Sequence, residues 1–554
     1  MERRLYVVLV LSVSAISAAD IEVTLPKGKI VGRDGIKTRG GRNICSFTGI
    51  PYAEPPIYQH RFQEPVPKQP WRGILNATLH GRQCPQKNVY SLGKKHETVG
   101  SEDCLHLNVF TPEINAGASM PVMVYIHGGS YQQGSNYRYI YGPEYILDKD
   151  IVLVTINYRL AALGFLSLGD EVFPGNLGLK DQALALEWIN ENIKFFGGNP
   201  DLVTIFGDSA GGASTSLHMF SPLSKGLFHR AISMSGTALC PWAVIPQPLA
   251  KDRGRAFLTL LGCPTEPSTK ALECLQNTPL EAIMNVQLKF YEWLFLPLVI
   301  FGPVIEEKGR PGAFLTLNPK TARPESSIPY IAGFSSGEGG IVASGLFTKA
   351  PHFVQDLETA PDRLLPLLLN LRGKYDQRAL DDISEQIKGY YFGGRQINND
   401  TIPEFIDMIT DNWFMYGTLA AGVRWGSPAY LYYYDYPSAL SYNQIFGDGS
   451  IKSVSHSDIL LNLFPLTAYF PNRVLSKEEN KVSSRILDLW TGFASEVAWG
   501  IQEHDWQPIN MENRIRFLHI TQDKPIMSDN LLHDRYQFWK ALDYTQGGKL
   551  AVII

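Results

Sequence analysis

A series of short apolar runs, most of them unbroken by polar residues, most constrains how this chain can fold. Such runs are typical of strands that are covered on both faces, as in parallel sheets. Helix-compatible segments separate them; residues 179–189, for example, carry apolar side chains at helical spacing. The expected strands are 122–126, 151–156, 203–206, 231–234, 328–332, 429–434 and 515–520. The alternation predicts an α/β fold with a large, mostly parallel central sheet and helices on both faces.

The chain is long for one domain, yet nothing in it marks a division. Its 554 residues contain no Pro/Ser-rich linker, block of like charge, internal repeat or low-complexity run. Hydrophobic residues make up 44% and charged residues 19%, as in ordinary globular proteins. The net charge of −4 gives no electrostatic reason to expect nucleic acid or acidic membranes as partners.

The N-terminus has the pattern of a secretory signal peptide. Arg3 and Arg4 precede an apolar stretch over residues 5–16, and the small residues Ser17-Ala18-Ala19 follow. The stretch is shorter than the ~20 residues that a membrane-spanning helix needs, which argues against an anchor. We interpret residues 1–19 as a signal peptide and expect a secreted, extracellular protein with no membrane anchor.

Export would permit disulfide bonds and N-glycosylation. Six cysteines are present, and six allow fifteen complete pairings, so the residues alone fix none of them. The sequons Asn76-Ala77-Thr78 and Asn399-Asp400-Thr401 predict glycosylation at Asn76 and Asn399, provided that both lie on the surface. No H-E-x-x-H or C-x-x-C metal signature occurs, so we expect neither a metal nor a cofactor.

Two pentapeptides fit the pattern G-x-S-x-G, which can mark a serine nucleophile on a sharp strand-to-helix turn. They are centred on Ser209 and Ser335. Ser209 follows the expected strand 203–206 and precedes a helix-compatible segment, whereas the chain after Ser335 is a poor helix start. Ser209 is therefore the predicted nucleophile; the alternative is an ordinary serine in a glycine-rich turn.

A serine hydroxyl is a weak nucleophile, so catalysis also needs a base, an acid that orients the base, and donors for the oxyanion. The sequence His127-Gly128-Gly129-Ser130 directly follows the expected strand 122–126. This position suits an oxyanion loop, because small residues let backbone N–H groups point at one spot. An ordinary β-turn is the alternative reading of the same residues.

These features together make the chain similar to type-B carboxylesterases, the cholinesterase-like group of α/β-hydrolases, with the general look of secreted insect esterases. The resemblance runs nearly end to end after the signal segment. Blocks that carry it are FTGIPYAEPP (47–56), SEDCLHLNVFTP (101–112), YIHGGSY (125–131), NYRLAALGFL (157–166), GNLGLKDQALALEWI (175–189), FGGNPDLVTIFGDSAGGAS (196–214) and SGTALCPWA (235–243). It implies one hydrolase domain over residues 20–554 that cleaves small carboxylic esters without a cofactor.

The resemblance supplies the acid and the base of the triad. The family's acid lies in a G-x-x-x-x-E-G stretch, which gives Glu338 here and makes the Ser335 pentapeptide part of the acid loop. The family's base stretch gives His456, although Ser453 stands in place of the usual glycine and Ile459 in place of the usual acidic residue. The chain order serine, acid, histidine is the order of the α/β-hydrolase fold.

The resemblance implies that the backbone N–H groups of Gly129, Ser130 and Ala210 form the oxyanion hole. Ser130 replaces a glycine, so its side chain is expected to narrow the acyl site. Asp208 replaces the commoner Glu before the nucleophile. The same Gly-Asp-Ser-Ala-Gly occurs in relatives of hormone-sensitive lipase, but those chains use an Asp acid and lack the EDCL block, so we reject that assignment.

The family pattern also covers cysteines and ion pairs. It implies the disulfides Cys84–Cys104 and Cys263–Cys274, an unpaired Cys240, and the structural ion pairs Arg61–Glu102 and Arg159–Asp181. Cys45 has no clear counterpart, so a Cys45–Cys240 bridge stays a disfavoured alternative.

The substrate is the least determined feature. No Trp lies between Cys84 and Cys104, where cholinesterases place the Trp that binds choline, and Asp208 departs from the Gln typical of juvenile hormone esterases. Trp242 and Phe301 are predicted to wall an apolar acyl pocket, with core packing as the alternative. A neuroligin-like adhesion protein is the rival function, disfavoured because the triad is complete. The sequence does not predict the oligomeric state.

Overall fold

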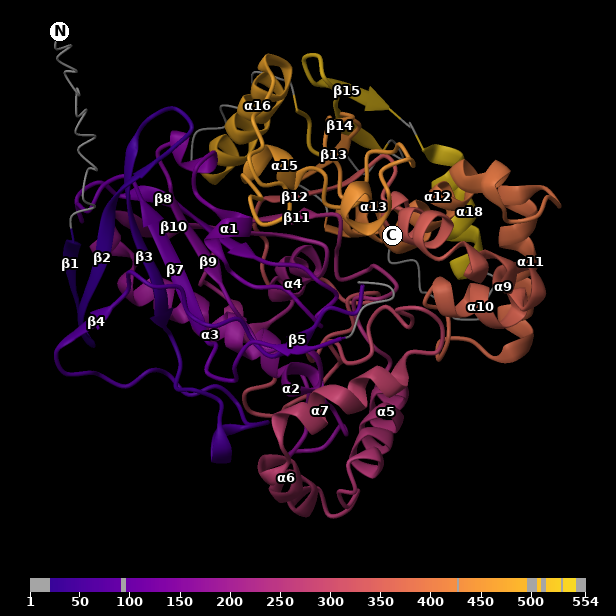
Figure 1. The fold of residues 1–554 in the computed structure, drawn as a ribbon, viewed down its shortest axis with the longest axis horizontal. Helices are drawn as coiled ribbons and strands as arrows, with labels where there is room; N and C mark the ends of the chain where they lie inside the picture. The colour runs from indigo at the N-terminus through magenta and orange to yellow at the C-terminus, as the bar shows by residue number, and fades with distance from the viewer. Residues whose placement is uncertain are drawn as a thin grey trace, which may run out of the picture.

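The computed structural model describes residues 20–90, 96–425, 428–495, 506–509, 515–529 and 532–544. The signal peptide predicted over residues 1–19 lies outside these ranges. The described residues form a 13-stranded sheet with the order β1-β2-β3-β7-β9-β8-β10-β11-β12-β13-β14-β15, and β4 pairs with β2 (Figure 1). The strand bounds are β1 Asp20–Leu25, β2 Gly28–Lys37, β3 Asn43–Pro51, β4 Ile74–Asn76, β7 His106–Thr111, β8 Met120–Ile126, β9 Val152–Ile156, β10 Gly198–Asp208, β11 Arg230–Met234, β12 Tyr330–Ser335, β13 Ala429–Tyr434, β14 Arg516–Ile520 and β15 Ile526–Asp529.

The centre of the sheet is parallel, as predicted. Strands pair in parallel from β9 through β8, β10, β11, β12 and β13 to β14. The strand expected over 328–332 begins later, at Tyr330, because Pro329 has no N–H for the ladder. The antiparallel strands β1, β2, β3 and β7 at one edge were not predicted from the apolar runs.

Helices cover both faces of the sheet. Along β8, Val122, Val124 and Ile126 enter one hydrophobic core, whereas Met123 and Tyr125 enter the other. The first core includes residues of α3 (Leu177–Asn192) and α4 (Ala210–His218), and the second includes residues of α15 (Leu460–Leu463) and α16 (Lys477–Ala494). Burial on both sides explains why the central strands lack an alternating polar pattern.

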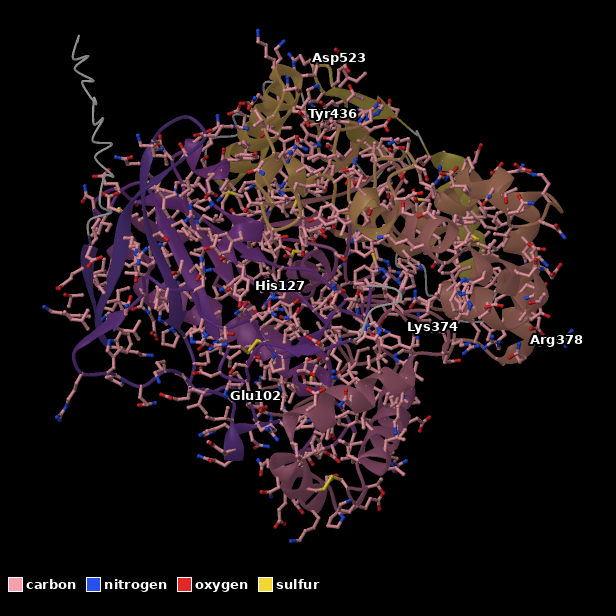
Figure 2. The ribbon with its side chains drawn as sticks, viewed as in Figure 1. Glu102, His127, Lys374, Arg378, Tyr436 and Asp523 are labelled. Carbon is pink, nitrogen blue, oxygen red and sulfur yellow. A yellow bond between two sulfur atoms is a disulfide. The ribbon has the colours of Figure 1, made fainter. Side chains whose placement is uncertain are left out.

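Further helices lie beyond the sheet in two groups (Figure 1). One contains α5 (Gln247–Leu260), α6 (Ser268–Asn277) and α7 (Leu280–Gln287). The other contains α9 (Val354–Thr359), α10 (Pro361–Leu368), α11 (Gln377–Phe392), α12 (Ile402–Thr410) and α18 (His533–Tyr544). Figure 2 places Arg378, at the start of α11, on the second group, and Lys374 lies in the chain just before that helix. The remaining helices are α1 Arg138–Tyr141, α2 Ala161–Phe165, α8 Gly340–Ala343, α13 Tyr416–Trp425 and α14 Asn443–Phe446. No helix of the described ranges is both long and apolar enough to cross a membrane.

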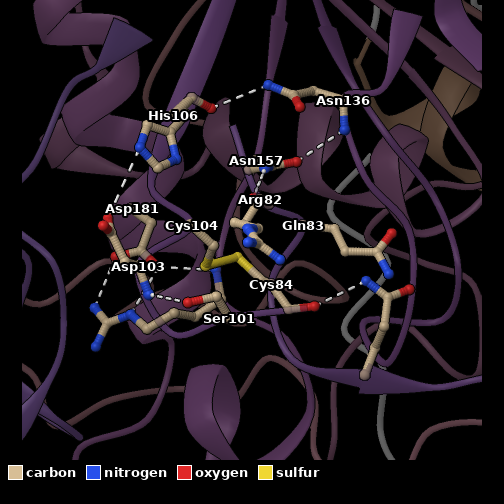
Figure 3. The surroundings of a disulfide bond; sticks show 12 residues. Arg82, Gln83, Cys84, Ser101, Asp103, Cys104, His106, Asn136, Asn157 and Asp181 are labelled. Atoms are coloured by element: carbon tan, nitrogen blue, oxygen red, sulfur yellow. Dashed lines mark hydrogen bonds and ion pairs between the residues drawn. A yellow bond between two sulfur atoms is a disulfide. The ribbon is translucent and has the colours of Figure 1, made fainter. Parts of the chain in front are cut away.

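Disulfides and ion pairs fix the loops around this frame. The structure contains the Cys84–Cys104 and Cys263–Cys274 disulfides, and it leaves Cys45 and Cys240 free and buried. Asn157 donates to the Arg82 carbonyl at 3.0 Å, which ties the Cys84–Cys104 loop to the chain after β9 (Figure 3). The guanidinium groups of Arg61 and Arg159 form two-pronged pairs with Glu102 and Asp181, as the family pattern implies.

Candidate active site

Ser209 lies on a sharp turn between β10 and α4, the setting that the nucleophile hypothesis requires. Its φ of 60° and ψ of −125° are strained for a residue with a side chain, and such strain concentrates at functional sites. The Ser209 N–H donates to the Met234 carbonyl at 2.9 Å, which joins the turn to β11. A Cβ on Gly211 would lie 1.9 Å from the Ile126 carbonyl oxygen, so the turn closes only with glycine there.

The glycine-rich loop after β8 packs directly against this turn. A Cβ on Gly128 would lie 2.9 Å from the Ser209 Cβ. Gly129 has a φ of +107°, and a Cβ there would lie 2.0 Å from the Gln133 carbonyl oxygen. His127, at the start of the loop and deep in the molecule (Figure 2), is buried and stacks on Tyr158 with ring centroids 4.4 Å apart. The loop therefore presents backbone groups next to Ser209.

Glu338 is held in the loop that follows β12. Its side chain is fully buried. One carboxylate oxygen accepts the Ser335 N–H at 2.6 Å and the Ser235 hydroxyl at 2.5 Å. The other oxygen accepts from Nδ1 of His456 at 2.5 Å. Every contact thus keeps the carboxylate aimed at the imidazole.

His456 is the histidine that the fold brings to Glu338. Its ring is 7% exposed and stacks on Phe414, with centroids 4.4 Å apart and planes 24° from parallel. When Nδ1 donates to Glu338, the neutral ring keeps a lone pair on Nε2, the form that a general base needs. Burial lowers the pKa of His456, but the Glu338 carboxylate outweighs it, and the pKa is raised above the ordinary value.

The loop around His456, residues 453–459, is called the base loop here. It contains both departures from the family pattern, and its hydrogen bonds compensate for them. Asp458, one place before the expected acidic position, is buried and accepts from the N–H groups of Ser455 and Tyr442, each at 2.8 Å. Its carboxylate therefore organises the loop from the inside. Ser453, in place of glycine, donates its hydroxyl to the Gly337 carbonyl at 3.2 Å, which ties the base loop to the acid loop.

Ser209 and His456 both line one cavity of about 320 Å³. Among the described residues no hydrogen bond joins the Ser209 hydroxyl directly to the imidazole. Catalytic hydrogen bonds of this kind are often long without substrate and shorten when it binds. The arrangement offers a hydroxyl, a base, a buried acid and nearby backbone donors, which together suit acyl transfer.

The carboxylesterase family model matches residues 19–539. The chain belongs to the carboxylesterase family. It is 38% identical to Esterase FE4 of Myzus persicae over 91% of this chain and 90% of that protein. It is 34% identical to the juvenile hormone esterase of Tribolium castaneum over 91% of this chain and 90% of that one. The crystal structure of Manduca sexta juvenile hormone esterase superimposes with a TM-score of 0.80 at 26% identity, over 95% of this chain and all of that one. The protein is a carboxylic ester hydrolase with the α/β-hydrolase fold.

Aromatic side chains dominate the walls of the esterase's cavity. Trp242 lines it, and its indole N–H donates to the Trp413 carbonyl at 2.9 Å. The other aromatic lining residues are Tyr90, Tyr141, Phe295, Trp413, Phe414, Tyr442, Phe446 and Tyr469. Phe301 is not among the lining residues: it is buried between Phe257 and Phe290, with centroids 5.3 and 5.5 Å away. The prediction for Phe301 is corrected, because its ring turns into the core behind the cavity.

Asp208 is a site residue of the esterase whose role the sequence did not indicate. Asp208, which precedes Ser209, accepts the hydroxyl of Ser457, which follows His456, at 2.5 Å. Its other oxygen is buried without a partner among the described residues. Burial raises the pKa of Asp208 to about 6. Asp208 thus joins the nucleophile turn to the base loop, a link between residues far apart in the chain.

The two sequons of the esterase lie on its surface. Asn76, the last residue of β4, is exposed, and its side-chain oxygen accepts from the Thr78 N–H at 2.9 Å. Asn399 is exposed too, although Thr401 of the same sequon is buried. Within the described ranges, no three His, Cys, Asp or Glu side chains gather in a way that would hold a metal ion.

Proposed function

We propose that this carboxylesterase works through an acyl-enzyme formed on Ser209. Nε2 of His456 takes the Ser209 proton as Oγ attacks the ester carbonyl carbon. The developing oxyanion accepts from the N–H groups of Gly129, Ser130 and Ala210. The imidazolium then gives its proton to the leaving alcohol oxygen as the bond between that oxygen and the acyl carbon breaks.

Water completes the cycle by the same route. His456 takes a proton from a water molecule, which attacks the acyl carbon, and Ser209 leaves with the proton returned to its oxygen. Glu338 keeps Nδ1 protonated and stabilises the imidazolium in both halves. The observation that carries this proposal is the 2.5 Å contact between His456 and the buried Glu338, with Ser209 in the same cavity.

The aromatic walls favour esters with apolar groups. Trp242, Phe295 and Phe446 offer apolar surface, and the polar lining comes from the loops around Ser209 and His456, the glycine-rich loop after β8 and the segment around Cys84. We therefore assign apolar carboxylic esters as the substrate class.

The same proposal includes export and glycosylation. The signal pattern of residues 1–19, the two disulfides and the exposed asparagines Asn76 and Asn399 support a secreted glycoprotein. Protein collected from the medium of insect cells should begin near Asp20, and glycosidase treatment should lower its mass.

Hydrolysis of a p-nitrophenyl ester series tests the enzymatic proposal. The wild-type protein should cleave the esters and lose activity after organophosphate treatment, and Ser209→Ala should be inactive although folded. Ser335→Ala is the matched control, because Ser335 lies in the other G-x-S-x-G pentapeptide. Activity retained in Ser209→Ala would reject Ser209 as the nucleophile.

A further inference from the structure

A hydrogen bond between two side chains connects the disulfide-closed loop to the oxyanion loop. Tyr90, in the segment between Cys84 and Cys104, donates its hydroxyl to the Ser130 Oγ at 2.6 Å. Both residues line the cavity that contains Ser209 and His456. The contact therefore joins two loops in the wall of the cavity that also holds Ser209.

The tyrosine is held rigidly in this position. Its ring meets Phe295 and Phe446 edge to face, with centroids 5.3 and 5.8 Å away. Burial raises the pKa of Tyr90 to about 12, so the phenol stays protonated and remains a donor at any working pH. Packing thus fixes the place of the hydroxyl, and the hydrogen bond to Ser130 gives its donor role.

Ser130 occupies a backbone position that glycine fills more easily. Its φ is +55°, in the left-handed region that residues with a Cβ seldom adopt. A hydroxyl has one proton to donate and two lone pairs that accept. Because Tyr90 supplies a proton to Oγ, the Ser130 proton is left to donate elsewhere, and no acceptor for it occurs among the described residues.

We propose that Ser130 donates its hydroxyl proton to the carbonyl oxygen of the bound ester, and that Tyr90 is the positioning residue that orients it. The inference rests on the proposed function, since it adds a side-chain donor to the backbone donors of the oxyanion hole. Two hydroxyls in series polarise one another, so the tyrosine strengthens the donor that it positions. The help is largest when negative charge collects on the oxygen, in the transition state.

A double-mutant cycle tests the proposal. The variants are Tyr90→Phe, Ser130→Ala and the double variant, with Tyr58→Phe as control. Tyr58 is 73% exposed, and it is not among the residues that line the cavity. The readouts are kcat, KM and the affinity for a trifluoromethyl ketone, which adds to the serine as a tetrahedral oxyanion.

Ser130→Ala should lower kcat by roughly 10- to 100-fold, somewhat less than the loss of a backbone donor. Tyr90→Phe should lower kcat about 5- to 10-fold and leave KM within about twofold, because one neutral hydrogen bond is lost. Ketone affinity should fall in parallel with kcat. The double variant should be no slower than Ser130→Ala, since Tyr90 acts only through Ser130.

The inference is overturned if Tyr90→Phe behaves like Tyr58→Phe, if it changes KM alone, or if the two losses add. Should Ser130→Ala not fold, Ser130→Gly removes the same hydroxyl and suits the positive φ. Ser209→Ala, assayed alongside, separates a failure of this inference from a failure of the proposed function. An inactive Ser209→Ala with a normal Tyr90→Phe sinks this inference alone, whereas an active Ser209→Ala sinks the proposed function itself.

Discussion

The acid–base side of this site and its nucleophile side are built in different ways. Glu338 and His456 are buried and held by hydrogen bonds from several segments, including Ser235 after β11 and Ser335 at the end of β12. Ser209 and Gly129 are held by backbone geometry: both have positive φ angles, and a Cβ on Gly129 would meet the Gln133 carbonyl oxygen. The acid–base side depends on hydrogen-bond partners, and the nucleophile side depends on a glycine at a position where no Cβ fits.

The difference explains which departures from the family pattern the chain carries. On the acid–base side, Ser453 and Ile459 replace the usual residues, and Asp458 and the Ser453 hydroxyl supply substitute hydrogen bonds. The nucleophile side carries the departures Ser130 and Asp208, but Gly129 and Gly211 are kept, because no side chain fits the 2.0 and 1.9 Å gaps. A hydrogen-bond network tolerates a substitution if its donors and acceptors stay paired, whereas a position without room for a Cβ tolerates no residue except glycine.

Glu338→Gln disrupts the acid–base side, and it has the largest expected effect on activity. The amide is nearly the same shape, but it can present an N–H to Nδ1 and favour the wrong imidazole tautomer. We expect kcat/KM to fall by about 10³- to 10⁴-fold with the fold intact, as measured by ester hydrolysis and circular dichroism. A variant within tenfold of wild type would remove Glu338 from the triad.

Gly129→Ala tests the nucleophile side by adding a Cβ to the oxyanion loop. The new Cβ meets the Gln133 carbonyl and must shift the oxyanion loop, so we expect a loss of about 10²- to 10³-fold in kcat. Gly389→Ala, in α11 with open space around it, is the matched control and should leave kcat unchanged. Equal activities in the two variants would mean that the loop geometry does not serve catalysis.

The pH profile sharpens the comparison with a smaller effect. His456 acts as a base only when neutral, and its pKa is raised, so activity should fall as pH drops, with a midpoint above the ordinary value of about 6.5. In Glu338→Gln the carboxylate is gone and the effect of burial remains, so the midpoint of the residual activity should move to lower pH. The pH profiles of kcat/KM for the wild type and for Glu338→Gln measure these midpoints. An unchanged midpoint would mean that a group other than His456 causes the fall in activity at low pH.

The nucleophile side could be predicted from local sequence because its determinants are local. Ser209 follows an apolar strand and precedes a helix, and the glycines that the turn needs are its sequence neighbours. The parallel sheet was predictable for the same reason, since each central strand is a continuous apolar run. The antiparallel strands β1 and β2 are polar on one face and gave no such signal.

The acid–base side could not be worked out from local patterns. Glu338 and His456 are 118 residues apart in the chain, and only the family resemblance pointed to them. Ser235 gave no signal of its own, because its role depends on where β11 ends relative to β12. The lining of the cavity could not be predicted either. The sequence around an apolar residue such as Phe301 does not indicate whether its ring faces a substrate or the core.

The most direct test of the central claim is the site of covalent labelling by a fluorophosphonate. We predict that the folded protein takes up one equivalent, that peptide mass spectrometry places the label on Ser209, and that Ser209→Ala takes up none. Prior reaction should also abolish hydrolysis of every p-nitrophenyl ester. Label on another residue, or ester hydrolysis that continues with Ser209 fully modified, would contradict the account.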